Sequence, residues 1–152
     1  MGTTNEQQLY NSAKAYYHGA EILMNKISPE SPTAYLLIQP AVTCASLSLK
    51  LYLKCLLAIE DKDREDSIYK IADLYRNLKE ETRKTILGKF DEFSNTSLSN
   101  EDLIKHLEGL DNAFVRWRYL HEEDAKCVNL DDLDQMILAS KATISAARPG
   151  WE

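Results

Sequence analysis

The sequence predicts an all-α fold, a single-domain antiparallel bundle of five or six helices. Apolar residues recur at three- and four-residue spacing along most of the chain, and no run of five or six residues alternates as a strand would. Only 5 glycines and 4 prolines occur, few for a β-rich chain with many tight turns. The length of 152 residues and the 44% hydrophobic content fit one domain, with its core between about residues 5 and 147.

The first two helices are expected over Asn5–Ile27 and Thr33–Ile59, separated by a Ser-Pro-Glu-Ser-Pro connection. From Ala41 onward the second is apolar almost all round, which predicts the central helix of the bundle. Pro40 should kink or divide it, because proline lacks the backbone N–H and clashes with the preceding turn. The apolar seam of the first helix consists of Leu9, Ala13, Tyr16, Ala20, Leu23 and Ile27, widened by Tyr10, Tyr17 and Met24.

The next two helices are expected over Asp66–Leu78 and Glu80–Phe93. No glycine or proline marks the bend between them, so its position stays open. The residues expected to face the core are Ile68, Ile71, Ala72, Tyr75 and Leu78 in the first, and Ile86, Phe90 and Phe93 in the second.

The last two helices are expected over Asn100–Ala125 and Leu130–Ala147. Ser99 followed by Asp102 is a typical N-terminal capping pattern for the former. The carboxylates of Asp131 and Asp132 suit the positive end of the latter helix and indicate an ordinary helix-end surface. The expected seams are Leu103, Leu107, Leu110, Phe114, Trp117 and His121 in the former, and Leu133, Ile137, Ile144 and Ala147 in the latter.

The net charge of −6 is distributed unevenly. Residues 70–89 contain six basic and three acidic side chains, a net charge of +3, whereas residues 91–134 contain four basic and twelve acidic side chains, a net charge of −8. Such an acidic half opposes strong non-specific binding of nucleic acid. The basic stretch is either a local binding surface or the solvated face of a helix.

The sequence predicts a cytoplasmic protein that neither crosses a membrane nor binds a metal or cofactor. Polar residues interrupt every long apolar stretch, and the N-terminus lacks the basic and apolar regions of a signal peptide. Cys44 and Cys55 fall about 16 Å apart along one helix, too far for a disulfide. With Cys127 they are expected to be free thiols in a reducing compartment. The chain contains neither a CxxC nor an HExxH motif.

The segment from Asn112 to Glu123 carries the most unusual side chains of the sequence, at the end of a strongly periodic helix. On a regular helix His121 lies within about 20° of Phe114, near the centre of the apolar stripe. Arg118 flanks it, and Arg116 points to the opposite side. A histidine in such a stripe needs a hydrogen-bond partner, for which Arg118 and Glu122 are the near candidates.

Three interpretations of this segment stay open. His121, Arg118 and Glu122 form a buried polar cluster that fixes the packing of the helix, or they line a cleft at a bundle seam or dimer interface, or the helix frays before His121. Trp117 is expected in the core. Tyr119 lies off the seam, where it could contact a partner chain.

Three stretches between about residues 40 and 120 make the chain resemble the HEPN domain family. Residues 45–57 resemble the long second helix of that family, an apolar stretch that ends in Lys54, Cys55 and two leucines. Residues 69–78 resemble its short helix. In the third stretch Arg116 and His121, separated by four residues, match the arginine–histidine motif of the family.

The resemblance implies a helical homodimer and, for members that keep the motif, metal-independent RNA cleavage that leaves a 2′,3′-cyclic phosphate. His121 would then transfer protons, and Arg116, or Arg118 as its closer neighbour, would stabilise the phosphate charge. The sequence departs from the catalytic pattern at Trp117, where a polar residue normally follows the arginine. Arg118–Tyr119 is similar to an Arg-Tyr pair of non-catalytic members.

Two functions therefore compete. The first is a non-catalytic module that binds a nucleotide or a protein, with candidate binding residues Trp117, Tyr119 and Glu122, in prokaryotic defence or a toxin–antitoxin pair. The second is an endoribonuclease of the toxin type that uses Arg116, Arg118 and His121. The partners that the resemblance implies are a second copy of the chain, an antitoxin or nucleotidyltransferase-like protein, and RNA or a nucleotide. The acidic half of the chain favours the first function.

Overall fold

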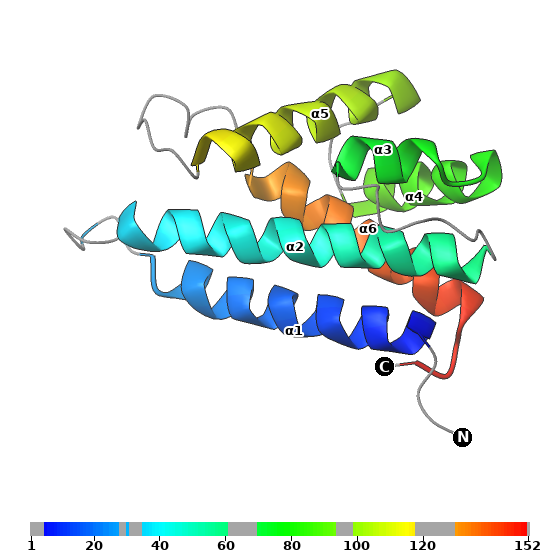
Figure 1. Cartoon of the computed structure of the whole chain (residues 1–152), viewed down its shortest axis with the longest axis horizontal. Helices are drawn as coiled ribbons and strands as arrows, with labels where there is room; N and C mark the ends of the chain where they lie inside the picture. Colours follow the sequence, from blue (N-terminus) through cyan, green and yellow to red (C-terminus); the bar gives the residue numbers. More distant parts are fainter. Residues whose placement is uncertain are drawn as a thin grey trace.

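The computed structural model describes residues 5–27, 30, 35–60, 70–93, 99–117 and 130–151, and only the backbone of residues 35, 112–117 and 130. This part of the chain is all-helical, as predicted. Its helices are α1 (Asn5–Asn25), α2 (Tyr35–Ile59), α3 (Ile71–Arg76), α4 (Glu80–Phe93), α5 (Asn100–Trp117) and α6 (Leu130–Ala147). Figure 1 shows the long α1 and α2 side by side along one edge, with α3, α4 and α5 on the other side of α2.

Helix α2 is the centre of the bundle, as its apolar sequence predicts. It packs against α1, α3, α5 and α6, and no residue between Ala41 and Glu60 is exposed. The lysines at 50 and 54 are half-buried. By length and composition alone, residues 36–59 meet the requirement for a membrane span, with a mean hydropathy of 1.6. Half of its most apolar 18-residue window is buried inside the structure.

Two contacts between α1 and α2 show that the pair is antiparallel. The Ser48 hydroxyl donates to the Ala13 carbonyl at 2.7 Å, and the Cys55 thiol donates to the Glu6 carbonyl at 3.3 Å. The residue number rises along one helix as it falls along the other. The first bond also gives the buried Ser48 hydroxyl an acceptor, as a polar group in a core requires.

Residues 148–151 fold back on the start of α1. The Arg148 guanidinium lies 3.3 Å from the Glu6 carboxylate. The Trp151 ring packs on the Tyr10 ring with 5.4 Å between centroids. Figure 1 shows the C-terminal segment running back beside the start of α1. The indole adds apolar cover to Tyr10, which also packs edge-on against Tyr52.

Most of the predicted core is buried. In α3 to α6 the buried residues include Ile71, Ala72, Tyr75, Leu78, Ile86, Phe90, Leu103, Leu107, Leu110, Leu133, Ile137 and Ile144. Ile68 and His121 lie outside the described residues, and the side chains of Phe114 and Trp117 are not described.

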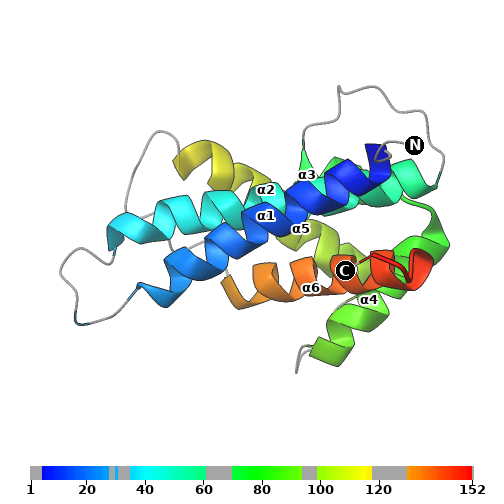
Figure 2. The same cartoon turned by 90° about the horizontal axis from the view of Figure 1, so that it is seen from below.

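Four core predictions are wrong, among them Met24, which is 39% exposed near the end of α1. Tyr16 is 42% exposed, because α1 turns Tyr10 rather than Tyr16 toward α2. These residues flank the buried Ala13, each about 60° away around the helix. Phe93 is 46% exposed at the end of α4, which extends beyond the other helices in Figure 2. Ala147 is exposed in the last turn of α6.

Pro40 does not divide α2, which runs unbroken from Tyr35 to Ile59. The proline removes the N–H that would bond to the Leu36 carbonyl. Both residues are exposed, Leu36 to 57%, so water can satisfy that carbonyl. The proline therefore sits near the helix start, where its cost is low.

Candidate functional site

The predicted site residues fall at the edge of the described structure. Arg116 and Trp117 form the end of α5 as it is described, with the backbone alone placed. Arg118, Tyr119, His121 and Glu122 lie outside the described residues. Their proposed roles therefore stay predictions, and the structure bears on them only through the contacts that fix α5.

A carboxylate of α5 caps the start of α3. The backbone N–H groups of Ile71 and Ala72 donate to the two carboxylate oxygens of Asp111, at 2.8 and 3.0 Å. The first N–H groups of a helix have no partner within it, and Lys70 at the N-cap position makes no side-chain cap. Asp111, 40 residues away from Ile71, supplies the missing acceptor. The same contact anchors α5 one residue before the segment that begins at Asn112.

Two further contacts tie α5 to α3. The Tyr75 hydroxyl donates to the Asn100 side-chain oxygen at 2.7 Å, and burial raises the pKa of Tyr75 to about 12. Arg76 bridges the carboxylates of Asp73 and Glu108 at 2.8 and 2.9 Å. Asn100, Glu108 and Asp111 thus fix α5 along most of its described length.

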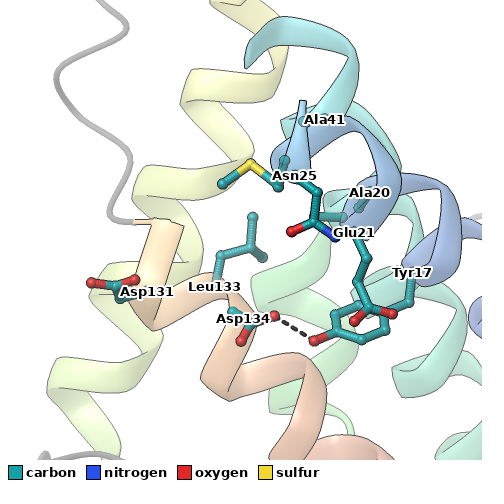
Figure 3. A pocket seen from close by; sticks show the side chains of 10 residues that line it. Tyr17, Ala20, Glu21, Asn25, Ala41, Asp131, Leu133 and Asp134 are labelled. Carbon is teal, nitrogen blue, oxygen red and sulfur yellow. Dashed lines mark hydrogen bonds between the residues drawn. The ribbon is translucent and has the colours of Figure 1, made fainter. Parts of the chain in front are cut away.

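A concave site lies between α1, α2 and the start of α6. It is a cleft of about 280 Å³, shown in Figure 3. Helix α6 begins at Leu130, so the cleft adjoins the point where the chain re-enters the described structure after residue 129. Its lining residues are Tyr17, Ala20, Glu21, Met24, Asn25, Ala41, Ala45, Asp131, Leu133 and Asp134.

The lining of the cleft is acidic. Glu21, Asp131 and Asp134 contribute carboxylates, and no lysine, arginine or histidine is among the lining residues. The Tyr17 hydroxyl donates to Asp134 Oδ1 at 2.6 Å, drawn as a dashed line in Figure 3. Partial burial, this bond and the nearby charges of Asp134 and Glu21 all raise the pKa of Tyr17. The phenol is therefore a neutral hydrogen-bond donor across the physiological range.

The described residues offer little for catalysis by a metal or an activated nucleophile. Within that part of the chain, no three His, Cys, Asp or Glu side chains gather as metal ligands. Burial raises the pKa of the Cys55 thiol to about 12, so the thiolate needed for nucleophilic attack is disfavoured. His106 Nδ1 lies 3.2 Å from an Asp132 carboxylate oxygen, a pair that links α5 to α6.

No local pattern in the sequence marks this cleft. Asp131 was placed correctly at an exposed helix start, but Tyr17, Glu21 and Asp134 carried no local signal. Tyr17 and Glu21 are four residues apart and so share a face of α1. Their convergence with Asp134 depends on how α1 and α6 cross, which a single sequence does not reveal.

Comparisons of the chain with models of known protein families, with curated proteins and with solved structures found no match.

Proposed function

We propose that the chain is a HEPN-like helical protein that acts as a non-catalytic module, binding a nucleotide or a partner protein. Support for the family comes from the resemblances at residues 45–57, 69–78 and 114–122, and an all-helical bundle is compatible with them. Trp117 and the Arg118–Tyr119 pair, which depart from the catalytic pattern, favour the non-catalytic version.

A protein partner is the better supported of the two ligands. The observation that carries this choice is the cleft between α1, α2 and α6, whose charged lining residues are all carboxylates. A phosphate brought there would meet Glu21, Asp131 and Asp134 and no compensating cation of the lining. The negative charges of the phosphate and the carboxylates would repel each other, whereas a cationic or neutral group of a protein can bind in the cleft without such repulsion.

The biological setting of the proposal follows from the resemblance. The module would work in the cytoplasm as a homodimer, in prokaryotic defence or a toxin–antitoxin pair. Its partner would be an antitoxin or a nucleotidyltransferase-like protein. Sedimentation equilibrium of the purified chain should then give twice the mass of one chain, and a monomer at all concentrations would contradict the homodimer.

The alternative is a metal-independent endoribonuclease. It is favoured by the Arg116–His121 spacing and by the anchoring of α5 at Asp111, which gives the helix before the motif a fixed position. In that case His121 would transfer protons, with Arg116 or Arg118 beside the phosphate.

An RNA cleavage assay in EDTA separates the two functions. We expect no cleavage by the wild-type chain. Cleavage that disappears in His121→Ala and Arg116→Ala, but persists in His106→Ala, would overturn the non-catalytic proposal. His106 is the matched control because it is a histidine of α5 that lies outside the motif, where it pairs with Asp132. Circular dichroism would check that each variant keeps its helices.

A further inference from the structure

The cleft between α1, α2 and α6 combines an apolar floor with a charged rim. Ala20, Ala41 and Ala45 supply short side chains from two helices, and Leu133 points into the space from α6 in Figure 3. Met24, 39% exposed, adds a flexible thioether. A floor of this kind can accept a slender aliphatic chain. The short alanine side chains leave room for it, and the leucine and methionine side chains provide apolar contacts on its flanks.

The rim offers carboxylate oxygens of Glu21 and Asp134 that can accept a further donor. Tyr17 occupies Oδ1 of Asp134 and holds that carboxylate in place, so Oδ2 is the oxygen left to receive another donor. The Glu21 carboxylate makes no ion pair with any described residue. Asp131 adds a third negative charge at the start of α6. A donor that enters this rim gains charge-assisted hydrogen bonds.

We infer that the cleft is the docking site for a lysine or arginine side chain presented by a partner protein. The methylene stem would lie on the alanines and Leu133, and the cationic head would reach Asp134 and Glu21. Long basic side chains bury their stems on apolar surface in this way while the head stays near water. The volume of about 280 Å³ is small for a cofactor and ample for one side chain.

The inference rests on the proposed function, because it names the partner chemistry of that interaction module. Charge complementarity selects the occupant: the lining contains three carboxylates and no cation, so an acidic or phosphorylated segment is repelled. A free metal ion is a poorer fit, since Glu21, Asp131 and Asp134 do not converge as a ligand set. The hydrogen bond from Tyr17 to Asp134 fixes the orientation of that carboxylate, which favours an occupant that donates to its second oxygen.

The test is an NMR titration of the full, ¹⁵N-labelled chain with capped alanine pentapeptides that differ only at the centre. The central residue is arginine, lysine or citrulline, the last being the uncharged counterpart of arginine. The arginine and lysine peptides should shift the amide signals of the cleft residues in a saturable manner and bind less well as ionic strength rises. The citrulline peptide should not.

Two double variants make the test specific. Glu21→Gln with Asp134→Asn should weaken binding of the arginine peptide by about tenfold, as expected for two solvent-accessible charge pairs. The matched control, Glu81→Gln with Glu101→Gln, changes net charge equally at exposed helix starts outside the cleft and should leave affinity unchanged. Tyr17→Phe should weaken binding by less, since Asp134 loses only its orientation.

Several results would overturn the inference: equal binding of the citrulline peptide, equal weakening in the control pair, or shifts that map away from the cleft. These outcomes are separate from those of the proposed function. RNA cleavage that depends on His121 would refute the non-catalytic module without altering a peptide titration. Failure of the peptides to bind would refute the docking site without creating ribonuclease activity.

Discussion

Carboxylates serve opposite purposes on the two sides of α2. On the α3–α4–α5 side, Asp111 accepts the backbone N–H groups that start α3. Glu60 does the same at the start of α4, where both its oxygens accept the Lys79 N–H at 3.0 and 3.1 Å and the Thr82 hydroxyl donates to it. On the α1–α6 side, Glu21 and Asp134 line an open cleft.

The difference shows how the placement of one chemical group separates stability from recognition. A carboxylate bound to N–H groups at a helix start satisfies donors that would otherwise be orphaned, and it meets the positive end of the helix dipole. In the cleft, Glu21 and Asp134 satisfy no helix start and repel each other, although Asp134 accepts one hydrogen bond from Tyr17. Removing a carboxylate at a helix start should lower the free energy of unfolding. Removing a carboxylate of the cleft should leave the free energy of unfolding nearly unchanged and weaken binding.

The largest effect is expected for Asp111→Ala. It removes two hydrogen bonds and leaves the N–H groups of Ile71 and Ala72, both buried residues, without their acceptor. The free energy of unfolding should fall by about 2 kcal/mol, the upper range for loss of a helix cap. Urea denaturation followed by far-ultraviolet circular dichroism measures it.

Glu108→Ala is the matched control for Asp111→Ala. It removes an acidic side chain of the same helix that faces α3, but its partner Arg76 is 41% exposed and has Asp73 as a second acceptor. Glu108→Ala should lower the free energy of unfolding by less than about 0.5 kcal/mol. Equal losses in the two variants would mean that Asp111 contributes only a surface charge.

A smaller effect is expected for Tyr75→Phe, on the same side of the bundle. At neutral pH it should cost about 1 kcal/mol, because the bond to Asn100 is lost in a buried setting. The pKa of Tyr75 is raised from 10.0 to about 12, so the folded state resists ionisation of the phenol. This contribution to stability is complete below pH 10 and is lost as pH rises from 10 through 12.

The gap in unfolding free energy between wild type and Tyr75→Phe should therefore narrow over that pH interval. Denaturation curves at neutral pH and at steps through the alkaline range measure it. A gap that stays constant through pH 12 would show that the phenol titrates alike in the folded and unfolded states.

The sequence predicts the regular parts of the fold well because their determinants are local. The expected bounds of the helices Glu80–Phe93 and Leu130–Ala147 coincide with α4 and α6. The predicted cap at Ser99 is confirmed, since its hydroxyl accepts the Asp102 N–H at 3.1 Å. An amphipathic period or a capping side chain acts within one or two turns, so it can be read from neighbouring residues.

What the sequence does not predict depends on contacts between distant residues. Helix α3 spans six residues where a helix over Asp66–Leu78 was expected, and its described start is stabilised by Asp111 on another helix. The exposure of Tyr16 and the packing of Trp151 on Tyr10 likewise depend on how distant segments pack together. The cleft also depends on distant residues, since Tyr17 and Asp134 are 117 residues apart.

The smallest effect on stability, and the sharpest contrast with Asp111, is expected for the cleft. Glu21→Gln combined with Asp134→Asn should change the free energy of unfolding by no more than about 0.5 kcal/mol, because both residues are exposed. A slight gain is the expected sign: the variant removes like-charge repulsion with Asp131, while the amide introduced by Asp134→Asn keeps an oxygen for Tyr17. Urea denaturation beside Asp111→Ala tests it. A loss as large as that of Asp111→Ala would show that the cleft carboxylates hold the fold together, and the division between a stabilising side and a binding side would fail.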